Sequence, residues 1–550
     1  MSPGKSILAV LALAVAAVGC RSGRAPRVVD SPPPPPVVAL SPTVELAAYK
    51  QTAAEAPSDE APEALRLPPI AQPDPAGEPG PTAEPEPIAA PETLPNPAAR
   101  PLELGQVISS VRSSFPLIQQ AAAGRVIASG ETLSASGAFD HKLDADSVSQ
   151  PLDFYKNYRN GIGVKRDTTW GGQTFAGYRI GRGEFEPWYL ERETNKGGEF
   201  KLGFMAPIGR DRWIDENRSA LWQAQLEQRR VEPEILAQVI FSVREGSVAY
   251  WGWVAAGANY RIAEGLLQLA EERNQGLEAQ VEAQEKAPID LVDNRRIIVS
   301  REAKQIDARR KLEQSAVKLS LYYRAADGAP LVADDALLPA AFPEVPRVDP
   351  GNDPLPLTPG DTELALRQRP ELVELQTVRQ QLNVALRQAN NETWPDLDAG
   401  LISSQDVGEP TSSKRDKSQL KLEAVVTMSV PLERRKALGK IRSLQGKLAQ
   451  VAAKNRYASD KIVAEVQVAR AALKAASERV VRATESFELA GKMQQAEREL
   501  FSNGQSTLFN LNIREQQAAE AAADRVDALL EYYIARADYA AALGEDAPAL

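Results

Sequence analysis

Side chains that commonly carry out chemistry are scarce in this sequence. Its 550 residues include a single cysteine, Cys20, and a single histidine, His141. A lone histidine without companion cysteines or a recurring carboxylate pattern is far more often structural than a base or a metal ligand. Ser/His/Asp catalysis would depend on His141, which no nucleophile motif accompanies, and neither a phosphate-binding glycine loop nor a His-Glu-x-x-His motif occurs. The sequence therefore predicts no enzymatic activity, no cofactor and no metal site.

The chemistry open to Cys20 is acylation. An apolar run at 7–18 follows the basic Lys5 and has the length of a signal peptide, too short for a membrane-spanning helix. It ends at "AVGC", residues 17–20, which resembles a bacterial lipobox, where the signal is cut before the cysteine and the thiol is acylated. An ordinary secretory signal with an unrelated cysteine is the alternative. We expect a signal peptide over 1–19 and a lipoprotein whose Cys20 carries an acyl chain such as palmitate.

The segment that follows, 20–101, is rich in proline and includes "PPPPP" at 32–36. Such a sequence cannot bury a core and favours extended, polyproline-like states. We therefore expect a disordered tether between the lipid and the folded body. An aspartate directly after the acylated cysteine would favour retention in the inner membrane. Arg21 holds this position instead, so the sequence favours the outer membrane. The net charge of −10 argues against a nucleic-acid partner.

The rest of the chain is predicted to be a tandem repeat. "APIGRDRWIDENRS" at 206–219 and "VPLERRKALGKIRS" at 430–443 each place Arg-Ser eleven positions after a proline. A period this long indicates duplication of a large unit rather than a solenoid of short repeats. The expected boundaries are a first repeat at 102–326, a linker at 327–360, a second repeat at 361–544 and a tail at 545–550.

Each repeat contains a predicted β-hairpin, at about 174–208 and at about 396–431. Apolar residues alternate with polar ones, as in "LKLEAVVTMSV" at 420–430, and the strands have about the 9–11 residues that cross a bilayer. Four strands cannot close a membrane barrel, which needs about eight or more, and lipid does not tolerate an open sheet edge. Several chains must therefore share one barrel if these strands span a membrane. A soluble four-stranded sheet over one core is the alternative.

Two very long helices are predicted after the hairpins, at 212–285 and 434–501. Each has roughly 70 residues, or ~100 Å, and Pro233 is expected to bend or break the first. In the second, apolar residues spaced alternately by four and three form a heptad seam from Ile462 to Ala490. An earlier seam has a shifted phase, which predicts a change of packing partner near Ile462. A plain antiparallel coiled coil fits the seam equally well.

Four passages in this order resemble the TolC-type outer membrane efflux proteins, and the resemblance covers 102–544. They are "ALRQRPELVELQTVRQQLNVALRQANNETWPDL", "VVTMSVPLERRKALGKIRS", "LFSNGQSTLFNLNIREQQAAEA" and "DRVDALLEYYIARADYAAALG". The resemblance implies a mainly α fold with a transmembrane β-barrel contribution: a homotrimeric channel-tunnel with a shared twelve-stranded barrel and a twelve-helix periplasmic tunnel. It also implies passive export of small molecules or other solutes across the bacterial outer membrane, together with a periplasmic adaptor and an inner-membrane pump.

The resemblance further assigns roles at the turns between the long helices. "SNGQ", 502–505, corresponds to a turn that contacts the adaptor in the family, where Gly504 would supply the backbone freedom of a tight turn. Its first-half counterpart is "KAPIDL", 286–291, which has Pro288 in place of the glycine. The residues expected to contact the adaptor are Pro288, Asp290, Leu291, Ser502, Asn503, Gly504, Gln505 and Leu508. Family members often line the closed tunnel entrance with an acidic residue two positions after an apolar one. Asp293 and Asn510 hold that place here, so an acidic ring would depend on Asp293.

Two other classes of function stay open at this point. A periplasmic adaptor or coiled-coil scaffold without a pore would also use long helices, although adaptors usually have one helical hairpin and this chain has two. A cell-wall enzyme is suggested only by the proline-rich tether, and no catalytic residues accompany it. The aromatic stretch "YWGWVAAGANY" at 250–260 is expected to pack between helices or against a partner rather than to bind a ligand.

Overall fold

The computed structural model describes residues 100–152, 154–185, 192–345, 360–411 and 417–546. All of them belong to one compact unit, Glu92–Leu550. The predicted signal peptide, Cys20 and the tether up to residue 99 lie outside the described residues. Within the described ranges, no helix combines the length and apolarity that a membrane crossing requires.

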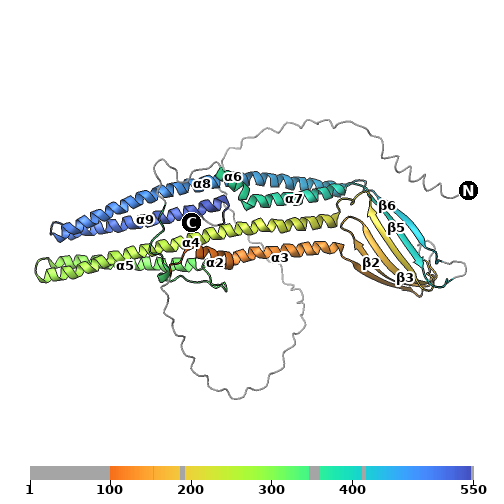
Figure 1. Ribbon diagram of the computed structural model, residues 1–550, viewed down its shortest axis with the longest axis horizontal. Helices are drawn as coiled ribbons and strands as arrows, with labels where there is room; N and C mark the ends of the chain where they lie inside the picture. The colour runs from red at the N-terminus through yellow and green to blue at the C-terminus, as the bar shows by residue number, and fades with distance from the viewer. Residues whose placement is uncertain (1–99, 153, 186–191, 346–359, 412–416, 547–550) are drawn as a thin grey trace, which may run out of the picture. The chain divides into compact units, whose positions relative to one another are not determined.

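The two repeats share the order of a short helix, a longer helix, a β-hairpin and two long helices, and the first repeat has an additional hairpin, β1–β2 (Figure 1). The first contains α2 (Leu104–Ser114), α3 (Pro116–Ser136), η2 (Gly137–Phe139), β1 (Lys142–Gln150), β2 (Asn157–Asp167), β3 (Gln173–Gly183), β4 (Glu199–Pro207), α4 (Glu216–Glu282), α5 (Pro288–Leu319) and η3 (Asp335–Leu337). The second contains α6 (Gly360–Gln368), α7 (Pro370–Asn391), β5 (Asp396–Asp406), β6 (Lys421–Ser429), α8 (Arg435–Ser502) and α9 (Leu508–Leu543). Pro116 and Pro370 begin the equivalent helices α3 and α7, where a missing N–H costs nothing.

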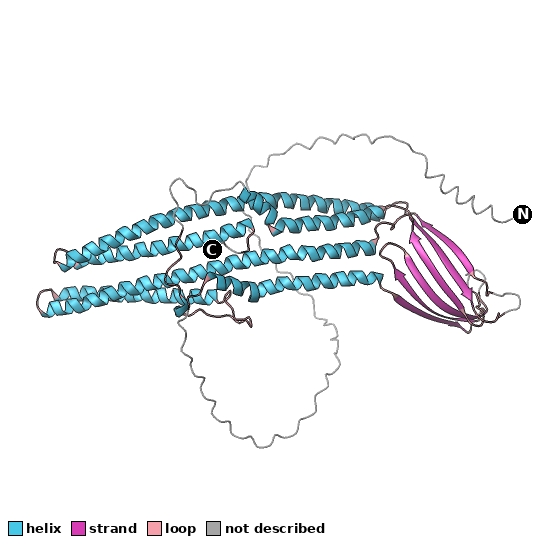
Figure 2. Ribbon diagram, in the orientation of Figure 1, coloured by secondary structure: helices cyan, strands magenta, loops and turns pink. Residues whose placement is uncertain are grey.

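The described strands form one antiparallel sheet of six, in the order β1-β2-β3-β4-β5-β6 (Figure 2). The sequence-based count of four strands was therefore wrong, because the first repeat has a second hairpin, β1–β2, before the predicted one. The remaining strands match the prediction: β3–β4 and β5–β6 fall within the two expected hairpins. β4 pairs with β5 over nine residues, and this pairing joins the two repeats into one sheet.

A tight turn at 168–172 connects β2 to β3. The Thr168 backbone N–H donates to the Gly172 carbonyl at 2.8 Å, and the Thr168 hydroxyl donates to the Gly171 carbonyl at 2.8 Å. Both glycines have positive φ values, +101° and +90°. A Cβ on Gly172 would lie 2.3 Å from the Met205 carbonyl oxygen, so this turn requires glycine both for its backbone and for space.

The long helices are continuous. The α4 helix has 67 residues and α8 has 68, each about 100 Å long. Pro233 lies inside α4 and does not break it, since this part of α4 packs through Val231 and Ile235 against Ala128 of α3, whereas the alternative of a bend stays a prediction. Burial on a neighbouring helix thus compensates for one missing backbone hydrogen bond. The Asp215 side chain caps the start of α4 by accepting from the Arg218 N–H at 2.7 Å.

The predicted seam of α8 is buried from Ile462 to Val480, where α8 packs on α9. The earlier seam, with Leu444 and Val451, is buried where α8 lies beside α7. The change of phase near Ile462 coincides with the end of α9, since Ile462 clusters with Leu543. The predicted change of packing partner is therefore confirmed.

The largest apolar cluster contains residues of α2, α4, α5, α8 and α9. Trp253 is fully buried there, and Trp251 stacks on Tyr533 of α9 with ring centroids 4.0 Å apart. Phe342 lies beside both rings, with its ring centroid 5.6 Å from that of Trp251 and 5.8 Å from that of Tyr533. The aromatic stretch at 250–260 therefore contributes to helix packing, as predicted.

Candidate functional site

One face of the sheet is apolar and exposed. Cross-strand register aligns one row of side chains across all six strands. The row consists of Leu143, Val164, Ala176, Leu202, Ser403 and Leu422. Leu143, Leu202 and Leu422 are 69%, 63% and 70% exposed, and further exposed apolar side chains on this face include Ile162, Phe200, Leu401 and Val426. A continuous apolar surface of this kind marks an interface with protein or with lipid.

The opposite face of the sheet is polar and contains many charges. The neighbouring row consists of Asp144, Gly163, Gly177, Lys201, Ser404 and Lys421. Ion pairs between strands lie on this face, such as Lys165 Nζ with Asp144 Oδ2 at 2.8 Å. The sheet therefore has the two-sided character of a membrane-spanning wall, apolar outside and polar inside.

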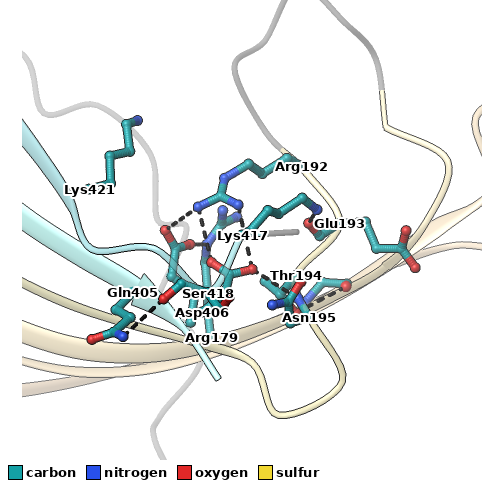
Figure 3. A network of polar contacts seen from close by, with 12 residues as sticks. Arg179, Arg192, Glu193, Thr194, Asn195, Gln405, Asp406, Lys417, Ser418 and Lys421 are labelled. Atoms are coloured by element: carbon teal, nitrogen blue, oxygen red, sulfur yellow. Dashed lines mark hydrogen bonds and ion pairs between the residues drawn. The ribbon is translucent and has the colours of Figure 1, made fainter. Parts of the chain in front are cut away.

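At the end of the sheet away from the helices, a polar network joins the two repeats (Figure 3). Arg192, from the β3–β4 loop, donates at 3.0 Å both to Glu199 Oε1 and to Asp406 Oδ1. Asp406 is fully buried and also accepts from the Asn195 backbone N–H at 2.9 Å. Arg179 donates to the other Glu199 oxygen at 2.5 Å. Because Asp406 ends β5, this network fixes a loop of the first repeat to the second.

The helices end in two tips with the same backbone geometry. At the second tip Gly504 has φ +70°, and its N–H donates to the Phe501 carbonyl at 3.0 Å. At the first tip Gln284 has φ +60° and donates to the Val281 carbonyl at 3.0 Å. The residue equivalent to Gly504 is therefore Gln284. Pro288, which the sequence comparison placed opposite the glycine, begins α5 just as Leu508 begins α9.

This alignment corrects the expected pairing of the entrance residues. Since Pro288 matches Leu508, the residue that matches Asn510 is Asp290, and Asp293 matches Ile513 instead. Asp293 forms an ion pair with Arg296 at 3.0 Å, and the Asn510 N–H donates to the capping Thr507 hydroxyl at 3.3 Å. The two predicted entrance residues are therefore not equivalent: Asp293 lies three positions after Asp290, the residue that matches Asn510.

The predicted tip residues lie at the two turns and at the starts of α5 and α9. Ser502, Asn503, Gly504 and Gln505 are exposed, as is Pro288, whereas Asp290, Leu291 and Leu508 are partly buried. Sequence reasoning missed the apolar residue that follows each helix start: Ile289 and Phe509 hold equivalent positions and are each 67% exposed. Each directly follows the first residue of a long helix, and an apolar residue at that position is the sequence feature that could have identified them.

A buried ion cluster links both helical hairpins a few turns from the tips. Glu515 of α9 is 2% exposed and accepts from Arg301 at 2.8 Å and from Arg273 at 3.1 Å. Burial, the largest cause, lowers the pKa of Arg273, and repulsion from Arg301 adds to the shift while Glu515 opposes it. Arg273 also donates to Asn294 Oδ1 at 3.1 Å. The cluster connects α4 and α5 of the first repeat to α9 of the second.

The sequence analysis did not single out this cluster, although the spacing contains a signal for it. Glu515 falls between the buried Leu511 and Ala518, so it occupies a seam position that is otherwise apolar. Arg301 similarly follows the buried Ile298. A charged residue at a seam position predicts a specific buried partner.

Comparison with solved structures identifies the architecture. The chain is similar to the outer-membrane channel OprN (15% identity, TM-score 0.57, covering 80% of this chain and 89% of OprN). It is also similar to the open state of the Neisseria gonorrhoeae outer membrane channel MtrE (15% identity, TM-score 0.56, 80% and 89% covered) and to the Campylobacter jejuni outer membrane channel CmeC (14% identity, TM-score 0.54, 80% and 85% covered). This chain has the fold of the outer membrane channels.

The channel fold accounts for the two-sided sheet and the paired helical tips together, and it confirms the resemblance to TolC-type proteins at the level of the fold. No protein-family model matches the sequence, and none of the curated proteins compared with it does. The single histidine, His141, lies exposed between η2 and β1. Among the described residues, no group of three or more histidine, cysteine and acidic side chains could hold a metal ion.

Proposed function

We propose that three copies of this chain form a passive channel-tunnel in the bacterial outer membrane, which exports small molecules or other solutes. In this proposal the channel works within a tripartite efflux or secretion system, with a periplasmic adaptor and an inner-membrane pump. The observation that carries the proposal is the sheet: an exposed apolar face, a charged opposite face and two unpaired edges, attached to helices about 100 Å long.

The apolar face favours a channel over a periplasmic scaffold or an enzyme. A sheet in water would expose Leu202, Leu401 and Leu422 together on one side, at a high cost in hydration. In lipid the same residues are favourable, and the unpaired edges of β1 and β6 then require partner strands from other copies. The charged face lines the pore, where Lys201 and Asp144 meet water.

A labelling experiment on two neighbouring residues tests this orientation. Leu202→Cys and Lys201→Cys lie on opposite faces of β4. In reconstituted vesicles, a bulky hydrophilic maleimide should label the cysteine at 201, which faces the pore, and should leave the cysteine at 202 unlabelled until the bilayer is dissolved. The unsubstituted chain measures any labelling of Cys20. Equal labelling of both positions in intact vesicles would show that the sheet does not span a bilayer.

The two tips are proposed as the adaptor contacts. Each presents an exposed turn followed by an exposed apolar side chain, Ile289 or Phe509, and neither turn contributes to a packed core. The residues assigned from the resemblance, from Pro288 to Leu291 and from Ser502 to Leu508, surround these side chains. Asp293 and Asn510 remain proposed entrance residues, and Asp290 joins them as the structural counterpart of Asn510.

We propose in addition that an acyl chain on Cys20 anchors the protein to the outer membrane and that the proline-rich tether leads from it to Leu104 of α2. The support is the "AVGC" motif and the apolar run before it. A single acyl chain binds a membrane weakly and reversibly. The barrel would therefore supply most of the membrane attachment.

A further inference from the structure

The β1–β2 hairpin is built like the rest of the sheet. β1 pairs with β2 over nine residues and β2 with β3 over eleven. Its outward side chains, including Leu143, Ile162 and Val164, continue the apolar face, and Lys165 and Asp144 continue the charged face. The two strands have nine and eleven residues, the lengths that cross a bilayer when tilted. In pairing and strand length this hairpin matches β3–β6, and its outward face is apolar at Leu143, Ile162 and Val164, although Ser147 donates to Asn160 Oδ1 at 2.7 Å nearer the β1–β2 turn.

The hairpin leaves β1 and β6 as the two edges of the sheet. In an antiparallel sheet with an even number of strands the two edge strands run in opposite directions. The β6 strand of one copy can therefore continue the antiparallel pattern with β1 of the next, and a ring of copies closes without a mismatched pair. An unpaired edge within lipid is excluded, because its backbone groups would have no hydrogen-bond partners.

We propose that three copies close an eighteen-stranded barrel, with β6 of each copy paired to β1 of the next. This inference rests on the proposed trimeric channel and replaces the twelve strands that the family resemblance implied, since three copies of six strands give eighteen. Barrels of 16–18 strands leave an open aqueous channel. Each edge strand of one copy is thus paired with an edge strand of another copy of this chain.

The strand number sets a measurable width. With strands about 4.8 Å apart and tilted by about 40°, the wall radius is about 18 Å for eighteen strands and about 12 Å for twelve. Equivalent positions on three copies would then lie about 31 Å apart in the larger barrel and about 21 Å apart in the smaller one. A spin label attached to Leu202→Cys, on the outer face of β4, lies roughly 6 Å further from the barrel axis than the wall, so double electron–electron resonance should report about 42 Å for eighteen strands and about 31 Å for twelve.

Crosslinking between copies tests which strand meets β6. Ala145 of β1 and Ala176 of β3 both lie on the apolar face, so cysteine at either position changes the wall little. Each is combined with cysteine at Leu422, Ala424 or Val426 of β6, which covers the possible registers. A short bis-maleimide in native membranes should crosslink at least one Ala145 combination into dimers and trimers and should leave the Ala176 combinations uncrosslinked. Chains with only one added cysteine serve as controls.

The outcomes separate this inference from the proposed function. If the Ala176 combinations crosslink instead, the hairpin lies outside the wall and the barrel has twelve strands, while the trimeric channel stands. A trimer in which no Ala145 combination crosslinks also overturns the inference, as does a spin-label distance of about 31 Å, the value for twelve strands. A protein that is a monomer in mild detergent and yields no crosslinked species overturns both the inference and the proposed channel.

Discussion

Removing the charge of Glu515 should destabilise the helical region strongly. Its carboxylate is the acceptor shared by Arg273 and Arg301, and all three side chains are at most 8% exposed. Glu515→Gln keeps the shape of the side chain but leaves two buried guanidinium groups without a counter-charge. Breaking a buried pair in this way costs about 3–5 kcal/mol. Screening by solvent does not reduce this value much, because the cluster is buried.

Thermal unfolding followed by circular dichroism at 222 nm, in detergent, measures the effect. Glu520→Gln is the matched control, since Glu520 lies on the same helix, is exposed and accepts a hydrogen bond from Gln516 one turn earlier. Its effect should stay within about 0.5 kcal/mol. Replacing Arg273, Arg301 and Glu515 together with methionine should restore much of the lost stability, because no buried charge remains. A Glu515→Gln protein as stable as Glu520→Gln would refute the view that this cluster holds the two hairpins together.

Three further predictions concern other parts of the chain. Cys20→Ser should abolish acylation and leave the precursor uncleaved at that site, and mass spectrometry of a mature N-terminus with a free Cys20 would argue against the lipobox. Gly504→Val should weaken export and crosslinking to the adaptor at a local strain of about 1–3 kcal/mol, with trimer yield unchanged, and unchanged export and crosslinking would exclude this turn from the docking surface. The control is Phe487 of α8, which is partly buried under Arg525 of α9: Phe487→Ala removes this packing and should lower trimer stability itself. The hydrogen bond from Arg230 is the main cause that lowers the pKa of Glu227 below its ordinary 4.5. The Glu227–Arg230 pair therefore stabilises the fold above pH 4.5, and this stabilisation is lost as the pH falls through the lowered pKa of Glu227. Glu227→Gln should flatten the acid side of a plot of unfolding free energy against pH. An unchanged plot would contradict this assignment.

The sequence was sufficient for the long helices and for four strands, because their periodicity is strong. The seam from Ile462 follows from its burial against α9, and the alternation before Pro431 follows from a sheet with one apolar, exposed face and one polar face. The β1–β2 hairpin was not predictable in the same way, since Asp144 and Gly163 are residue types depleted in strands. A Cβ on Gly163 would approach the Ala176 carbonyl oxygen to 3.1 Å, so tertiary packing rather than local propensity explains this glycine.

The candidate site was predictable only in part. Gly504 was expected to provide the freedom of a tight turn, and its positive φ confirms this. The equivalent backbone state at Gln284 gave no signal in the sequence, because glutamine rarely adopts a left-handed conformation. The alignment of the two tips on Pro288 was therefore wrong, and only the backbone geometry revealed the pairing of Asp290 with Asn510.

Planar-bilayer conductance of the purified protein, paired with its mass in detergent, tests the central claim most directly. The proposed channel predicts a particle with the mass of three chains and discrete conductance steps in the bilayer. Leu202→Asp, which places a charge on the lipid-facing side of the sheet, should reduce insertion and conductance, whereas Lys201→Asp on the opposite face should insert normally and alter ion selectivity. A monodisperse monomer that inserts and conducts, or a trimer with no conductance in the bilayer, would contradict the account.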